Sequence, residues 1–109
     1  MGSYEEHQEI LNDVASSVEL YFDDVETEVE YYRDNGQTAG EFDIKIIDEE
    51  DNMMYYLEIK SSYKQDSKGR KQLKRAEEYH RDLGYNFYGE IVHEDDIEEV
   101  IRFMAKQSL

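Results

Sequence analysis

Apolar and polar residues alternate over three segments of the chain, and this two-residue period restricts the fold more than any other feature. Residues 25–32 alternate apolar or Thr side chains with mainly acidic ones, and residues 42–47 and 54–61 form two further strand-like segments. Successive side chains of a β-strand point to opposite faces of its sheet. The pattern therefore predicts three strands, the first with its acidic face toward water. The acidic stretch 48–52 joins the second and third strands as a hairpin loop.

Three other segments carry the helical period of 3.6 residues. Residues 4–18 and 66–83 form the first two predicted helices, Gly84 ends the second, and a third helix follows residue 96. An aromatic and β-branched strand over residues 85–93 separates the last two helices. The order α-β-β-β-α-β-α predicts an α/β fold with a mixed four-stranded sheet flanked by helices, because a β-α-β crossover joins parallel strands. The stripe of the first helix comprises Ile10, Leu11, Val14, Ala15 and Val18.

Length and composition limit the class of protein. A chain of 109 residues is long enough for one modest core, so we expect a single domain over residues 1–109. Met1, Gly2 and Ser3 resemble a cloning scar and stay out of the fold prediction. The absence of Cys excludes a disulfide scaffold, a thiolate zinc site and a Cys nucleophile. Apolar runs are too short to span a bilayer and no secretion signal is apparent, so we expect a cytoplasmic protein without a membrane partner.

A polar set lies on the second and third predicted strands, on the face opposite Phe42, Ile44, Leu57 and Ile59. If the hairpin pairs as its short loop suggests, Asp43 comes near the edge formed by Glu58 and Lys60. Two carboxylates and the Ile59 main-chain carbonyl would form an all-oxygen site suited to Mg²⁺ or Mn²⁺. An ammonium beside them can hold a water or balance charge on a phosphate. The alternative is a surface Asp beside an ordinary cross-strand Glu–Lys pair.

These residues resemble the PD-(D/E)XK nuclease superfamily, which contains many restriction enzymes and archaeal Holliday junction resolvases. The resemblance rests on residues 40–44, a short hairpin and residues 56–61. The predicted order of elements is similar to the restriction-endonuclease-like core of that family, so the resemblance covers nearly the whole chain. It implies that Asp43 and Glu58 bind the metal ion and that Lys60 serves the attacking water.

The resemblance implies two further site positions. Such nucleases often carry a Glu on the first helix, and among Glu5, Glu6 and Glu9 we choose Glu6, which flanks the apolar stripe. His7 falls on the stripe itself, where a lone His is more often a satisfied core residue. On the second long helix, Gln72 lies on the inward side, where many family members place a polar residue that touches the site. A Gln satisfied at the helix edge is the alternative.

A formal charge of −16 by itself opposes binding to nucleic acid, because phosphates repel carboxylates. It is compatible with a halophile, or with a protein encoded by a virus or mobile element. Residues 60–75 nevertheless carry seven basic residues and one acidic, a charge of +6, which leaves −22 for the rest. A flexible, solvated Lys-rich loop is the bland interpretation. We expect instead that this segment contacts the DNA backbone through Lys64, Lys68, Arg70, Lys71, Lys74 and Arg75.

Together these features predict a Mg²⁺-dependent endonuclease that hydrolyses DNA phosphodiester bonds. The resolvase-like resemblance implies that it recognises the structure of branched DNA, acting as a homodimer. Two alternatives stay open from the sequence. One is a non-catalytic protein of the nuclease fold that binds nucleic acid or another protein. The other is an acidic DNA mimic that occupies basic proteins through the −22 charge.

Overall fold

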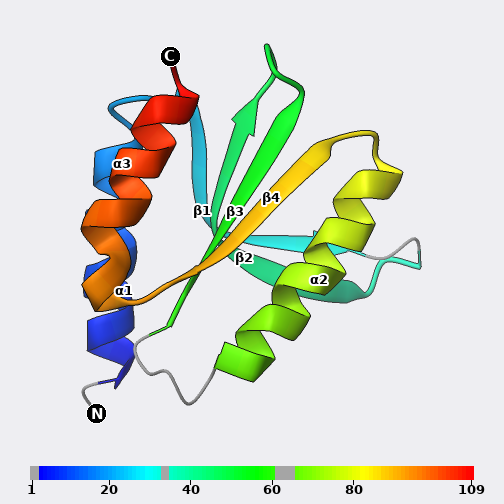
Figure 1. Cartoon of the computed structure of the whole chain (residues 1–109). Coiled ribbons are helices and arrows are strands. Elements are labelled where there is room, and N and C mark those ends of the chain that lie inside the picture. The colour runs from blue at the N-terminus through cyan, green and yellow to red at the C-terminus, as the bar shows by residue number, and fades with distance from the viewer. Residues whose placement is uncertain (1–2, 33–34, 61–65) are drawn as a thin grey trace.

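Three helices pack on the two faces of one four-stranded sheet in the computed structural model, which describes residues 3–32, 35–60 and 66–109 (Figure 1). The α/β fold and the mixed four-stranded sheet predicted from the sequence are confirmed. One 3₁₀ turn, η2, precedes the last helix and was not predicted. None of the helices in the described ranges is long and apolar enough to cross a membrane. The elements are α1 (Ser3–Val18), β1 (Asp24–Tyr32), β2 (Thr38–Asp48), β3 (Met53–Ile59), α2 (Asp66–Asp82), β4 (Asn86–Val92), η2 (Glu94–Asp96) and α3 (Ile97–Gln107).

The strands lie in the order β1-β2-β3-β4. Strands β1 and β2 are antiparallel, and so are β2 and β3, in which Ile44 pairs with Leu57. Strand β4 runs parallel to β3 after the crossover through α2. The predicted helix end at Gly84 is also confirmed, because this residue has a φ of 92°, in the left-handed region that glycine adopts without steric cost.

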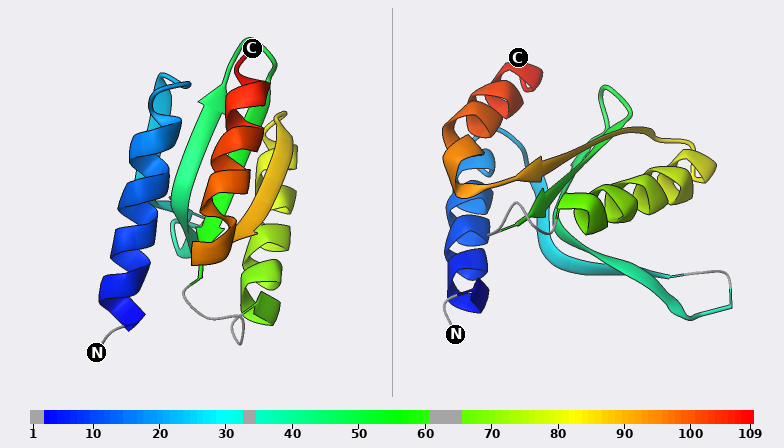
Figure 2. Two further views of the ribbon diagram at one scale, coloured as in Figure 1. Left: turned by 60° about the vertical axis from the view of Figure 1, so that its left-hand side comes forward. Right: turned by 60° about the horizontal axis from the view of Figure 1, so that its bottom comes forward.

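The sheet has a hydrophobic core on each face. Helices α1 and α3 lie together on one side and α2 covers the other, so the molecule has three layers (Figure 2). Helix α1 buries the whole apolar stripe predicted from its sequence. The core under α1 and α3 contains Val14, Val18, Ile44, Leu57, Ile59 and Met104, and the core under α2 contains Tyr31, Phe42, Met54, Tyr56 and Ala76.

Phe42 lies on a different face from the one predicted. Strict alternation places it with Ile44, yet Ile44 packs under α1 and α3 whereas Phe42 packs under α2. The change occurs where the pairing of β2 with β3 ends, at Ile44 and Leu57. Strand β1 pairs with the other edge of β2, Thr27 with Ile44 and Val29 with Phe42. Between these two pairs lies Glu28, whose φ of 53° interrupts the regular strand. The prediction was wrong here because β2 bends away from β3, and alternation holds only within a regular strand.

His80 lies inside the aromatic core under α2. Its ring is 5.0 Å from the ring of Phe42 and 4.8 Å from that of Tyr79, and its Nδ1 lies 2.9 Å from the Ala76 carbonyl. Burial lowers the pKa of His80 below its usual value of 6.5, and the nearby Lys45 cation lowers it further, against the effect of the Ala76 hydrogen bond. The folded protein therefore holds this imidazole in its neutral form.

Protonation of His80 should destabilise the fold as the solution becomes acidic. The unfolded chain takes up the proton near pH 6.5 and the folded chain only at lower pH. The stabilisation is therefore complete above about pH 6.5 and is lost as the pH falls below that value. We expect the melting temperature of the wild-type protein, relative to His80→Phe, to fall between pH 7.5 and pH 5. A relative melting temperature that stays constant over this range would contradict the buried neutral imidazole.

Candidate active site

Asp43 lies at the point where β2 leaves β3. Its Oδ2 accepts a hydrogen bond from the main-chain N–H of Ile59 at 2.8 Å, so a carboxylate replaces the backbone acceptor that a continued β2 would supply. The register that pairs Ile44 with Leu57 would place Asp43 opposite Glu58 if it continued. The sequence-based expectation that Asp43 approaches the Glu58–Lys60 edge is confirmed. Binding of an ion by the Ile59 carbonyl stays a prediction.

Glu58 and Lys60 form a buried pair beside Asp43. Lys60 Nζ is 3.4 Å from Glu58 Oε1, and the two residues are only 8% and 4% exposed. Glu58 Oε2 is also buried and has no hydrogen-bond partner among the described residues. The alternative of an exposed surface pair is therefore wrong. A side-chain hydrogen bond with Asp43 is one cause of the raised pKa of Glu58, so the neutral carboxyl has a partner there and only the ionised form leaves Oε2 unsatisfied. An unpartnered buried polar atom costs about 1–3 kcal/mol, so ionisation of Glu58 is favourable only where a cation binds beside it.

Without a bound cation, ionisation of both buried carboxyls, Asp43 and Glu58, is unfavourable. Burial, followed by the neighbouring Asp43 carboxyl, raises the pKa of Glu58 to about 8, and Lys60 opposes this rise. Close carboxyls of like charge cannot both ionise cheaply in a low-dielectric site. A divalent cation between Asp43 and Glu58 would remove the repulsion and give Oε2 a partner, so the donor set fits a hard cation such as Mg²⁺ or Mn²⁺.

Asp43 and Glu58 are the side chains best placed to hold such an ion. No three His, Asp or Glu side chains are already gathered as a metal-ligand set within the three described ranges of the chain.

The first helix presents His7 to the site. His7 Nε2 lies 3.3 Å from Asp43 Oδ2, whereas Glu6, predicted from the sequence as the helix ligand, is exposed, and no hydrogen bond or ion pair joins it to Asp43 or Glu58 in the described part of the chain. The sequence places His7 on the inward stripe of the first helix but does not identify its partner, because Asp43 is 36 residues away in the chain. A ligand role for Glu6 has no support from this arrangement.

Helix α2 packs its first turn against Lys60. A Cβ added to Gly69 would lie 3.2 Å from Lys60 Cε and 3.1 Å from Ile91 Cδ1, so the small residue lets the helix approach the lysine stem. Gln72, one turn later, is half-buried, and its Oε1 is buried without a hydrogen-bond partner among the described residues. The inward position predicted for Gln72 is confirmed. Its contact with the site is not shown and stays a prediction.

The exposed side of the first half of α2 is strongly basic. Lys64 lies outside the described residues, and Lys60 belongs to the buried site rather than to a solvated surface. Arg75 also reaches toward the sheet, since its cation lowers the pKa of Tyr31 against the larger effect of burial. The exposed basic residues in the first half of α2 are Lys68, Arg70, Lys71, Lys74 and Arg75, and Arg81 near its end is also exposed and pairs with Glu77.

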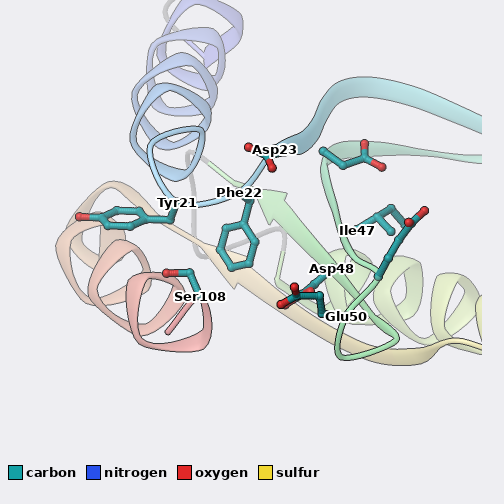
Figure 3. A pocket seen from close by; sticks show the side chains of 9 residues that line it. Tyr21, Phe22, Asp23, Ile47, Asp48, Glu50 and Ser108 are labelled. Atoms are coloured by element: carbon teal, nitrogen blue, oxygen red, sulfur yellow. The ribbon is translucent and has the colours of Figure 1, made fainter.

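A hollow of about 430 Å³ lies at the hairpin end of β2 and β3 (Figure 3). Five carboxylates belong to its wall, so a phosphate would be repelled there. Asp43 and Glu58 lie toward the opposite end of β3, beside the first turns of α1 and α2. A polyanion can therefore approach the end of the sheet beside Asp43 and Glu58 more readily than it can approach this acidic hollow. The acidic residues of the hollow are Asp23, Asp24, Asp48, Glu49 and Glu50.

Comparisons of the chain with protein-family models, with curated proteins and with solved structures give no match.

The raised pKa of Glu58 makes a prediction about the metal-free protein. The unfolded chain ionises near pH 4.5 and the folded chain near pH 8, so the stability of the wild-type protein should fall as the pH rises between these values. Glu58→Gln removes this titration. Measured in EDTA, its stability advantage should grow from pH 5 to pH 8, toward an upper bound of about 4–5 kcal/mol. Added Mg²⁺ should stabilise the wild-type protein and not the variant; an advantage independent of pH would contradict the buried pair.

Proposed function

We propose that this protein is a Mg²⁺-dependent endonuclease of the PD-(D/E)XK type that hydrolyses DNA phosphodiester bonds. One observation carries the proposal: the carboxyls of Asp43 and Glu58 are adjacent and buried, with the buried Lys60 beside them. When Glu58 is ionised, its Oε2 has no hydrogen-bond partner in the described part of the chain. Burial of two acids and a lysine at the end of a strand costs stability, and the hydrogen bond from Ile59 N–H offsets this cost only at Asp43. Clusters of buried groups with a strongly shifted pKa are typical of functional sites. The four-stranded mixed sheet with its three helices is compatible with a restriction-endonuclease-like core.

Each residue of the site has a defined task in this proposal. Asp43 and Glu58 hold the cation, and the hydrogen bond from Ile59 N–H fixes the orientation of Asp43. A bound Mg²⁺ supplies Lewis-acid stabilisation of a phosphate and lowers the pKa of water. Lys60 can donate hydrogen bonds to the attacking water or to a phosphate oxygen, because its ammonium lies against Glu58 and its stem is held by α2. Gln72 supports the site from the same face of α2.

The substrate is assigned from charge and size. The basic side of α2 begins beside Lys60, so a DNA backbone that follows this helix passes the site. A chain of 109 residues has little surface left for reading base sequence. We therefore propose recognition of DNA structure, as in Holliday junction resolvases, with a homodimer placing two sites on two strands.

Cleavage of four-way-junction, flap, duplex and single-stranded DNA with Mg²⁺, Mn²⁺ or EDTA tests the activity. Asp43→Asn should lower the rate by more than about 100-fold, because loss of even an outer-shell partner of a metal costs about 10- to 100-fold. The amide oxygen of the variant can still accept the Ile59 N–H, so the fold should survive. Lys60→Gln should also abolish cleavage while it keeps a stem of similar shape.

Glu49→Gln is the matched control, because it removes one carboxylate from the exposed hairpin loop, away from Asp43. It should cleave like the wild-type protein. Unchanged cleavage by a folded Asp43→Asn protein would refute the assignment. A wild-type protein that binds DNA but cleaves none of the four substrates would favour the non-catalytic binding module.

The salt dependence of DNA affinity tests the proposed contact between α2 and DNA. Lys71→Gln with Lys74→Gln removes two exposed cations from α2. We expect the slope of log affinity against log salt to fall in magnitude by about 1.8, since each phosphate contact contributes about 0.9. Lys106→Gln makes one such change on α3, on the other face of the sheet, and should leave the slope unchanged. Equal slopes for the double variant and the wild-type protein would refute DNA binding by α2.

A further inference from the structure

The two outer strands of the sheet, β1 and β4, differ in how well their free edges are protected against pairing. In the described part of the chain, no further strand pairs with the outer edge of either one. Strand β1 carries four acidic side chains, and one of them, Glu28, has a φ of 53° that breaks the regular strand. Charges and irregular residues are the usual protection of an edge strand. Strand β4 lies at the opposite edge beside α2, and Glu90 is its one charged residue, so this edge is the one open to another strand (Figure 2).

The hydrogen bonds at the two ends of β4 show which of its main-chain groups point away from β3. The Asn86 N–H donates to the Asn52 carbonyl at 3.1 Å, and the Val92 carbonyl accepts from the Lys60 N–H at 3.0 Å. Strands β3 and β4 are parallel, and in a parallel pair the residues whose N–H and C=O face the neighbouring strand recur at every second position. The even-numbered residues of β4 are therefore bonded to β3, and the main-chain groups of the odd-numbered residues point outward.

The outward edge of β4 is complementary to a second copy of itself. Its main-chain groups belong to Phe87, Gly89 and Ile91, each with an N–H donor and a carbonyl acceptor, and Gly89 is the midpoint of the strand. An antiparallel copy centred on Gly89 would pair the full length of β4 and place Phe87 opposite Ile91 of the second copy, with two hydrogen bonds exchanged. Glu90 would lie opposite Tyr88 of the second copy, so no like charges would face each other.

Helix α2 adds charge complementarity to this pairing. It packs on β3 and β4, and its first half carries the exposed cations described above. Its second half contains Glu77, Glu78 and Asp82, with Arg81 as the one permanent cation. A two-fold axis at Gly89 reverses the second copy along the strand and keeps both α2 helices on one face of the sheet. The basic half of each helix would then lie alongside the acidic half of the other.

We propose, resting on the homodimer of the proposed function, that two copies of this chain pair through the edges of their β4 strands into one continuous sheet. Neighbouring strands are about 4.8 Å apart, and each residue advances a strand by about 3.3 Å. Glu58 is level with Ile91, which is two positions from Gly89. The two Glu58 Cα atoms would therefore be about 20 Å apart. Both candidate sites would lie beside the basic halves of α2 in one assembly.

Double electron–electron resonance tests the arrangement without any reaction. The chain has no Cys, so one introduced Cys carries the spin label of each copy. Asn86→Cys changes an exposed residue three positions from Gly89, and its two Cα atoms should be about 20 Å apart in the dimer. Glu26→Cys on β1 is the matched control, and its two Cα atoms should be about 30 Å apart or more, because both whole sheets lie between the two β1 strands. A shorter distance for Glu26→Cys than for Asn86→Cys, or a monomeric wild-type protein, would overturn the proposal.

A proline on the outward edge tests the hydrogen bonds themselves. Ile91→Pro removes an N–H that does not bond to β3, and an edge strand tolerates proline at such a position. Ile91→Ala is its matched control, because it trims the same side chain and keeps the N–H. The two-fold axis repeats the lost bond, so analytical ultracentrifugation should give a dimer dissociation constant about 10- to 100-fold higher for Ile91→Pro than for Ile91→Ala.

A folded Ile91→Pro protein that dimerises as tightly as Ile91→Ala would refute pairing through β4. If the proline variant does not fold, the distances from Asn86→Cys and Glu26→Cys decide the question alone. DNA cleavage by a monomeric wild-type protein would leave the endonuclease proposal standing and remove the dimer. A dimer with the expected distances that cleaves no DNA would confirm the β4 pairing and refute the endonuclease.

Discussion

The hydrogen bond from Ile59 N–H to Asp43 Oδ2 is the interaction on which the site depends. Strand β2 stops pairing with β3 at Ile44, and the next main-chain donor on β3 would be left buried without an acceptor. Leaving such a group unsatisfied costs about 1–3 kcal/mol, so Asp43 has a structural reason to point inward. That bond holds its carboxylate beside Glu58, and it lets β2 turn away so that Phe42 can join the core under α2.

The same arrangement places two buried carboxyls close together at one end of the sheet, which lowers the stability of the fold when both are ionised. Asp43 and Glu58 are both buried, and the pKa of Glu58 is raised to about 8, so ionisation of Glu58 beside Asp43 is unfavourable even with Lys60 adjacent. The two large hydrophobic cores on the faces of the sheet can support this cost. If the site binds a divalent cation as proposed, binding would remove this repulsion and would therefore stabilise the fold.

Local patterns predicted the elements and the pairing of the hairpin. The spacing of residues 42–47 and 54–61 around a short loop was sufficient to bring Asp43 to Glu58, because strand register follows from loop length. The face of Phe42 could not be predicted, since it depends on a bend that involves the left-handed Glu28 of another strand. The helical period of residues 4–18 predicted that His7 faces inward. Its contact with Asp43 could not be predicted, because it depends on how α1 packs on the sheet.

The distribution of charge over the fold, rather than the net charge, restricts where a polyanion could bind. The acidic residues of the hollow surround the hairpin end of β2 and β3, whereas the exposed cations of α2 begin beside Lys60. If the protein binds DNA as proposed, the backbone would gain counterion release mainly along the first half of α2 and would be repelled at the acidic hollow, which restricts the orientation of approach and keeps total affinity low. A weakly held but well-oriented substrate suits an enzyme that must release its product, because binding the substrate tightly would not lower the barrier to cleavage. The charge of −16 is therefore compatible with DNA hydrolysis, provided that the productive contact is confined to α2.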